Sequence, residues 1–129
     1  MKGSVRFGRA AFAIAAVAFA LCVAVQVLLA GMAVFVDALY WARHTSFVHF
    51  IEFVPLLMLA FAFTGKLPAG MRWLSGGLFG LVLVMYFTAN FGSVSPVVAA
   101  FHPVVALGLF GLSARVAIRG CKLWKERGA

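Results

Sequence analysis

Ionisable side chains are rare in the long apolar stretches of this 129-residue chain. One stretch carries His44, His49 and Glu52, another carries His102, and Gln26 is the main uncharged polar residue among them. An ionisable group inside a membrane-spanning helix costs at least about 2.5–3.5 kcal/mol, so each of these is a candidate functional residue. Imidazole and carboxylate groups favour two kinds of chemistry, which are metal ligation and proton transfer.

The two histidines best placed for metal ligation are His44 and His102. Each lies about 9 Å along its own helix, counted from Ala38 and from Pro96, at 1.5 Å per residue. If both helices begin at the outer surface, the two imidazoles lie at one depth and can face each other across a bundle. Two histidines from facing helices are the ligand set of a six-coordinate haem. The spacing makes b-type haem between them a candidate, with Arg43 near a propionate, whereas ordinary interhelical hydrogen bonds are the interpretation that spacing alone favours.

His49 and Glu52 form a separate candidate pair. About 140° around the helix separates His49 from His44, so the two histidines cannot share one ligand face. His49 and Glu52 are three residues apart and can touch. Pro55 frees a backbone carbonyl one turn back, which could give Glu52 another partner. An internal hydrogen bond is the favoured interpretation, and a proton- or ion-coupled carrier that uses His49 and Glu52 is an alternative.

The elements that must position these residues are spanning helices. The chain is 65% hydrophobic and 11% charged, with a mean hydropathy of +1.09, whereas soluble domains are about 45–50% apolar and about 25% charged. Each span needs about 20 apolar residues. The sequence predicts an all-α, integral membrane four-helix bundle that runs up-down-up-down as a single domain over residues 1–129. The expected helices cover about 10–36, 38–64, 71–91 and 96–119; the first is too long for a signal peptide and is expected to be retained.

The distribution of lysine and arginine predicts the orientation of the bundle. Ten of the eleven fall at one end of the predicted bundle, and only Arg43 falls at the other. Because cytoplasmic loops carry the excess of basic residues, both termini are expected in the cytoplasm, at a bacterial inner membrane. The ten are Lys2, Arg6, Arg9, Lys66, Arg72, Arg115, Arg119, Lys122, Lys125 and Arg127.

Several other classes of function find no support in the chain. The net charge of +8 lies at helix ends, so we expect a lipid bilayer and no nucleic acid as partner. Cys22 and Cys121 have no metal-type spacing and are not expected to form a disulfide. No phosphate loop, nucleophile elbow or His-x-x-x-His pair is present, so no catalytic residue is predicted and the question of enzyme activity stays open. A cofactor-free accessory or assembly subunit, with a membrane-protein partner or as a homodimer, is the alternative to a haem protein.

Three short motifs occur in the chain: Gln26-Val-Leu-Leu-Ala-Gly31, Trp41-Ala-Arg-His44 followed by Gly65-Lys66-Leu67-Pro68, and Phe101-His102-Pro103-Val104. In this order and spacing they resemble an uncharacterised family of small four-helix bacterial membrane proteins. The resemblance implies the fold and the paired histidines, but no reaction. Val48 and Val105 depart from the family pattern, which has a small residue and an asparagine there. More distantly, the arrangement resembles the four-helix haem-binding halves of haem A synthase and membrane b-type cytochromes, which implies electron transfer or haem handling.

Overall fold

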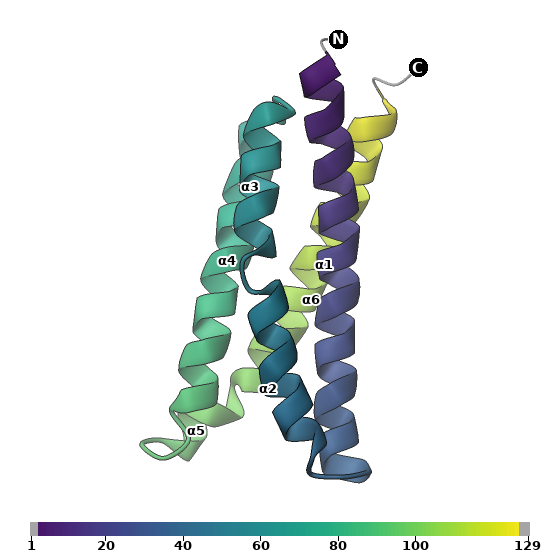
Figure 1. The fold of residues 1–129 in the computed structure, drawn as a ribbon. Coiled ribbons are helices and arrows are strands. Elements are labelled where there is room, and N and C mark those ends of the chain that lie inside the picture. The colour runs from purple at the N-terminus through teal and green to yellow at the C-terminus, as the bar shows by residue number, and fades with distance from the viewer. Residues whose placement is uncertain (1–2, 127–129) are drawn as a thin grey trace.

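The computed structural model describes residues 3–126, and within that range all regular structure is helical (Figure 1). Four helical spans of 22 to 33 residues are long and apolar enough to cross a membrane, which indicates a multi-pass membrane protein. Lys2 and Arg127, which contribute to the predicted charge asymmetry, lie outside the described residues. The helices are α1 (Gly3–Phe35), α2 (Tyr40–Ile51), α3 (Val54–Thr64), α4 (Ala69–Asn90), α5 (Pro96–Ala100) and α6 (His102–Lys125).

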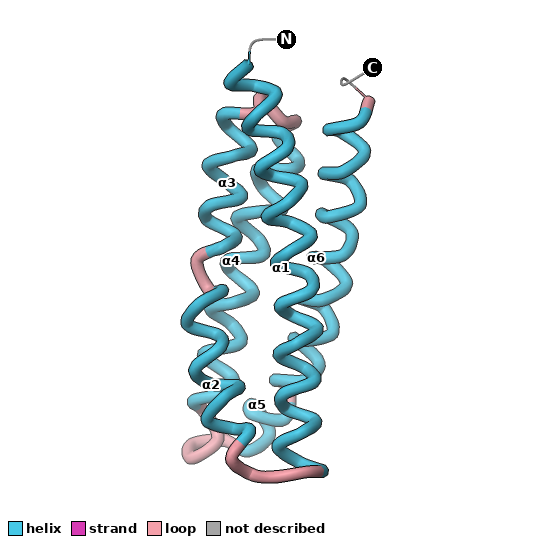
Figure 2. Tube along the Cα trace, turned by 45° about the vertical axis from the view of Figure 1, so that its right-hand side comes forward, coloured by secondary structure: helices cyan, strands magenta, loops and turns pink. Residues whose placement is uncertain are grey.

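Two of the four spans are interrupted by a short break. The second span divides into α2 and α3 at Glu52 and Phe53, and the fourth divides into α5 and α6 at Phe101. A proline lies in the first turn after each break, Pro55 in α3 and Pro103 in α6. Proline lacks the backbone N–H and disfavours helical geometry in the residue before it, so each helix restarts there. Figure 2 shows the first break as a loop in the middle of the span.

The helix ends differ from the predicted ranges because helices continue past the apolar residues that a membrane requires. The first helix begins at Gly3 rather than near residue 10, and the last ends at Lys125 rather than near residue 119. The added turns carry Arg6, Arg9 and Lys122, whose types are good helix formers. The second span begins at Tyr40 rather than residue 38, and α4 covers residues 69–90 rather than 71–91.

The spans lie side by side along their length. α1 packs on α6, α3 and α2, and α4 packs on α3 and α6. Both ends of the described chain lie at the same end of the molecule as the α3–α4 turn, whereas the α1–α2 turn and α5 lie at the opposite end (Figure 1). We call these the terminal end and the histidine end, because the second holds His44 and His102.

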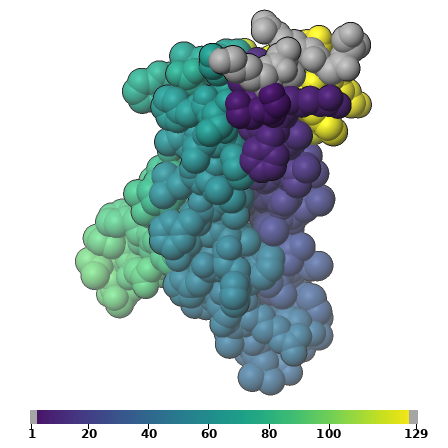
Figure 3. All heavy atoms as spheres, turned by 45° about the horizontal axis from the view of Figure 1, so that its top comes forward, coloured from purple at the N-terminus to yellow at the C-terminus, as the bar shows by residue number. Residues whose placement is uncertain are grey.

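The buried core is concentrated toward the terminal end. At the histidine end, Ile51 is the buried residue of α2, and none is buried in α5. The space-filling view in Figure 3 shows the α4–α5 corner projecting away from the α1–α2 corner. Dense packing therefore gives way to looser packing along the bundle. The core cluster comprises Phe12, Ala16, Phe19, Ala20, Val23, Met58, Ala62, Leu67, Met71, Leu78, Val82, Leu109, Val116 and Ala117.

A close backbone crossing joins α1 to the end of α3. A Cβ added to Gly8 would lie 2.8 Å from the Cα of Gly65, too close for any side chain. The next residue, Arg9, is buried; its Nε donates to the carbonyl of Gly65 at 2.9 Å and its guanidinium donates to the carbonyl of Leu123 at 3.3 Å. A cation there stabilises the carbonyl ends of α3 and α6. Arg9 is thus a packing residue as well as a basic residue of the charge asymmetry.

Candidate functional site

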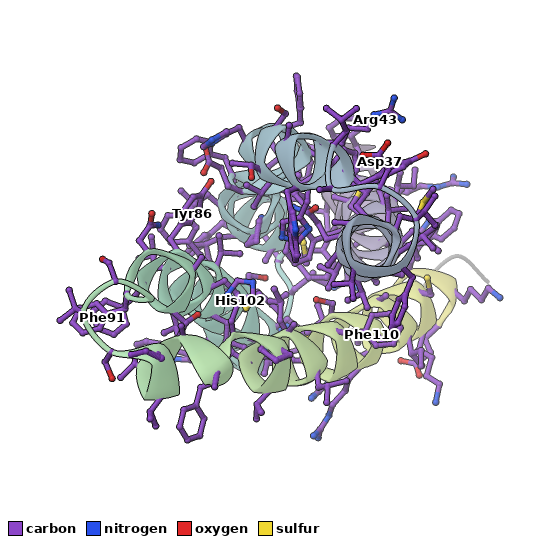
Figure 4. All side chains as sticks on the ribbon, turned by 90° about the horizontal axis from the view of Figure 1, so that it is seen from below. Asp37, Arg43, Tyr86, Phe91, His102 and Phe110 are labelled. Carbon is purple, nitrogen blue, oxygen red and sulfur yellow. The ribbon has the colours of Figure 1, made fainter. Side chains whose placement is uncertain are left out.

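His44 from α2 and His102 from the first turn of α6 converge at the histidine end. Their ring centroids are 6.5 Å apart and the ring planes cross at 67°. Both side chains are half-buried. Figure 4, seen from the histidine end, shows His102 pointing from α6 into the interior of the helix arrangement. The structure thus brings together the two histidines that the spacing singled out.

Hydrogen bonds indicate which nitrogen of each ring carries hydrogen. The Nδ1 of His44 lies 3.0 Å from the backbone carbonyl oxygen of Gln26, and the Nδ1 of His102 lies 3.1 Å from that of Met85. A carbonyl oxygen only accepts, so these two contacts favour the tautomer in which each Nδ1 donates. In the neutral ring the Nε2 atom then carries the lone pair. This tautomer, with Nδ1–H bound to a carbonyl, is the usual state of a metal-binding histidine.

Thr88 of α4 is a second partner of His102. Its hydroxyl lies 3.0 Å from the Nδ1 of His102 and 3.0 Å from the carbonyl oxygen of Val84 one turn back. The hydroxyl can donate to Val84 and accept from His102, and Thr88 is itself buried. Sequence analysis missed Thr88 and the carbonyl of Met85. A threonine within an apolar helix is a weak signal, because most such hydroxyls bond only to their own helix.

Gln26 contributes two groups to the same region. Its carbonyl oxygen accepts from His44, while its side chain is buried at 9% exposure. Within residues 3–126, the side-chain oxygen Oε1 of Gln26 has no hydrogen-bond partner. Buried polar atoms nearly always have one, so an unpaired amide oxygen indicates a water or a bound group as its missing partner.

The remaining predicted cofactor contact is Arg43. Its guanidinium lies over the ring of Tyr40, 4.8 Å from the centroid, and the side chain is exposed. In Figure 4 Arg43 lies at the periphery, pointing away from His102. The structure therefore does not bring Arg43 to the histidine pair. Successive residues of an α-helix point about 100° apart, so Arg43 does not face the same side of α2 as its neighbour His44.

His49 and Glu52 come together with a residue that the sequence did not indicate, Tyr86 of α4. The hydroxyl of Tyr86 donates to the Glu52 carboxylate and lies 3.1 Å from the Nδ1 of His49. The Nδ1 of His49 and the Oε1 of Glu52 are 3.6 Å apart. Glu52 stands at the break between α2 and α3, so the cluster ties that break to α4. At 3.6 Å the predicted direct hydrogen bond between His49 and Glu52 is not formed, and the Tyr86 hydroxyl from another helix is the hydrogen-bonding partner of both.

Replacing Tyr86 with phenylalanine is expected to lower the free energy of unfolding in detergent by about 1–3 kcal/mol, because Glu52 loses its hydroxyl donor. Unfolding by sodium dodecyl sulfate in mixed micelles, followed by circular dichroism, measures the change. Tyr40→Phe is the matched control, since among the described contacts the Tyr40 hydroxyl makes no hydrogen bond. Equal stability of the two variants would refute a stabilising role for the cluster.

The middle part of the chain matches a known protein family. The family of unknown function DUF6220 matches residues 26–91, which are more than half of the 129 residues. The chain belongs to this family. No curated protein and no solved structure matches it.

The DUF6220 match bears on the sequence resemblances in two ways. The predicted membership of an uncharacterised family is confirmed. The more distant resemblance to haem proteins stays a prediction. The matched region begins at Gln26 and includes His44, Glu52, Tyr86 and Thr88, whereas His102 follows it.

Proposed function

We propose that this protein holds b-type haem between His44 and His102, in a bacterial inner membrane, and serves electron transfer or haem handling. The observation that carries the proposal is the convergence of two imidazoles, each with its Nδ1 against a backbone carbonyl oxygen that can accept its hydrogen. That arrangement leaves two Nε2 lone pairs available to one metal.

The distance between the rings fits a shared metal ion. A ring nitrogen binds a metal at about 2 Å, and each ring centroid lies roughly 1 Å behind its nitrogen, so two axial imidazoles have centroids about 6 Å apart. The observed separation is 6.5 Å.

The number of ligands favours haem over a metal ion bound by protein alone. Within the described part of the chain, no group of three or more His, Cys, Asp or Glu residues could hold a metal ion. Structural and catalytic zinc sites need three or four protein ligands. A haem brings four nitrogens of its own, so two histidines complete its coordination.

The surroundings of the pair also support a bulky apolar cofactor. The core cluster stops short of the histidine end, where α2 packs on α1 rather than closely on α4 or α6. Gln26 leaves a buried amide oxygen without a partner in this part of the described chain. A porphyrin between the helices would fill the loosely packed region and bury the apolar faces around it.

Bound haem would supply one-electron chemistry, and the chain would supply the environment. His44 and His102 would hold the iron, and the carbonyls of Gln26 and Met85 with Thr88 would hold the imidazole orientations. The apolar helices would exclude water from the iron and so affect its reduction potential. No residue is assigned a catalytic role.

The orientation in the membrane is part of the proposal. Both ends of the described chain and the α3–α4 turn share one end of the molecule (Figure 1). The segments at that end carry most of the basic residues. The excess of lysine and arginine favours placing that end in the cytoplasm, with the spans running up-down-up-down. The histidine pair would then lie toward the outer face of the membrane.

A visible absorption spectrum tests the haem proposal directly. Protein purified in mild detergent from haem-replete cells is expected to show a Soret band and the sharp reduced bands of a six-coordinate b-type haem. The double variant His44→Ala/His102→Ala is expected to be colourless. His49→Ala is the matched control and should keep the spectrum, because His49 lies in the Tyr86 cluster rather than in the pair.

Two outcomes would overturn the proposal. One is a wild-type protein that is colourless and takes up no added haemin, which would favour a cofactor-free accessory or assembly subunit. The other is a haem spectrum that the double variant retains. The carrier alternative has less support, because Glu52 is engaged by the Tyr86 hydroxyl and ties two helices together.

A further inference from the structure

A shallow groove of about 470 Å³ lies on α6 toward the terminal end, away from the histidine pair. All of its lining residues come from α6, so it is an outward-facing surface rather than part of the core. It is lined by Gly111, Ala114, Arg115, Ile118, Arg119 and Lys122.

The polar side of the groove is wholly basic. Arg115, Arg119 and Lys122 are exposed and spread over two turns, about 10 Å along the helix axis. Among the described residues, no acidic residue lines the groove. Three cations in one groove near a helix end create a site of positive potential, which attracts an anionic group.

The floor of the groove is apolar and open. A Cβ added to Gly111 would meet no atom within 4 Å, and Ile118 is 60% exposed. Ala114 lies between them on the same face of the helix. The missing side chain at Gly111 leaves a shallow channel along the helix in which a hydrocarbon chain can lie against the backbone.

We propose that this groove binds an anionic phospholipid, with the phosphate at Arg115, Arg119 and Lys122 and one acyl chain along Gly111, Ala114 and Ile118. The ligand must carry both a negative headgroup and a hydrocarbon chain, because the cations and the open apolar floor belong to one groove. Lysine and arginine side chains near the cytoplasmic end of a spanning helix attract anionic lipid headgroups, and the proposed orientation places the groove at that end. The site requires neither haem nor the histidine pair.

Native mass spectrometry of the detergent-solubilised protein tests the proposal. Dioleoyl phosphatidylglycerol is added at a fixed ratio, and dioleoyl phosphatidylcholine with the same acyl chains is added in a parallel sample. Each basic residue beside an anionic lipid contributes roughly a fivefold preference, so wild type is expected to retain the anionic lipid at least about tenfold more strongly. The triple variant Arg115→Gln/Arg119→Gln/Lys122→Gln is expected to lose that preference.

Matched variants separate this groove from general surface charge and from a simple anion site. Arg6→Gln/Lys66→Gln/Lys125→Gln removes three exposed cations outside the groove and should keep the preference. Gly111→Leu should weaken retention of the anionic lipid severalfold, whereas Gly77→Leu, at another open and exposed glycine on α4, should not.

Four outcomes would overturn the proposal. They are equal retention of the two lipids by wild type, an equal loss in both triple variants, no difference between Gly111→Leu and Gly77→Leu, and displacement of the lipid by inorganic phosphate at the same concentration. The last would identify an anion site that does not use the apolar floor. Circular dichroism of every variant checks that the helices remain folded.

Discussion

His44→Gly and His102→Gly are each expected to convert the proposed six-coordinate haem to a five-coordinate form, and free imidazole is expected to restore the original spectrum. Each glycine removes one axial nitrogen and leaves a space the size of the lost ring. Because each side chain is half-buried and bonded through Nδ1 to a carbonyl, added imidazole can occupy the same space and donate to the same oxygen. Haem retention should fall by about a hundredfold or more without imidazole, since loss of a group that only orients a ligand already costs about 10–100-fold.

Two further variants separate ligation from a general structural role. His49→Gly should change neither the spectrum nor its response to imidazole. Thr88→Val removes one acceptor of His102 but leaves the carbonyl of Met85, so haem retention should fall by about tenfold while the spectrum stays six-coordinate. A pair of single-histidine variants that stay six-coordinate without imidazole would show that His44 and His102 are not the axial ligands.

Gly8→Leu is expected to reduce the free energy of unfolding by about 3 kcal/mol, near the upper end for an overpacked site. The side chain would overlap the backbone of Gly65, which cannot move aside as a flexible side chain could. Separation of α1 from α3 would also break the hydrogen bond from Arg9 to the Gly65 carbonyl. Unfolding by sodium dodecyl sulfate in mixed micelles, followed by circular dichroism, measures the loss.

Gly31→Leu is the control for this variant, because Gly31 lies on the same helix and a Cβ there meets no atom within 4 Å. It should not lower the free energy of unfolding, because leucine is a better helix former than glycine by about 0.8 kcal/mol. If Gly8→Leu is as stable as Gly31→Leu, the close crossing of α1 and α3 does not hold the terminal end together.

The contacts that hold the helices together and the proposed haem site lie at opposite ends of the molecule. At the terminal end, the core cluster, the Gly8–Gly65 crossing and buried Arg9 hold α1, α3 and α6 together. At the histidine end, breaks in two spans and looser packing leave the imidazoles half-buried. The proposed site thus lies in the less densely packed part of the fold, where functional regions are commonly found.

Hydropathy alone was sufficient to predict the four spans and the all-α class. Lipid offers no hydrogen bonds to the backbone, so long apolar segments must become helices whatever their neighbours are. The pairing of His44 with His102 also followed from the sequence, because a helix advances a fixed distance per residue and thereby sets the depth of each side chain. Interior prolines indicated where the helices would be distorted, although not that each span would divide in two.

The partners of the polar groups could not be read from the sequence. The Nδ1 atoms of His44 and His102 bind backbone carbonyls. Every residue has a backbone carbonyl, so no residue type in the sequence indicates which one a histidine will bind. The contact of Tyr86 with Glu52, the outward direction of Arg43 and the burial of Arg9 depend on the rotation of each helix about its axis. Packing between helices sets that rotation, and an almost uniformly apolar helix does not encode it in its periodicity. The sequence by itself thus determined the spans and the depth of each candidate residue, while only the tertiary structure decided which residues face one another.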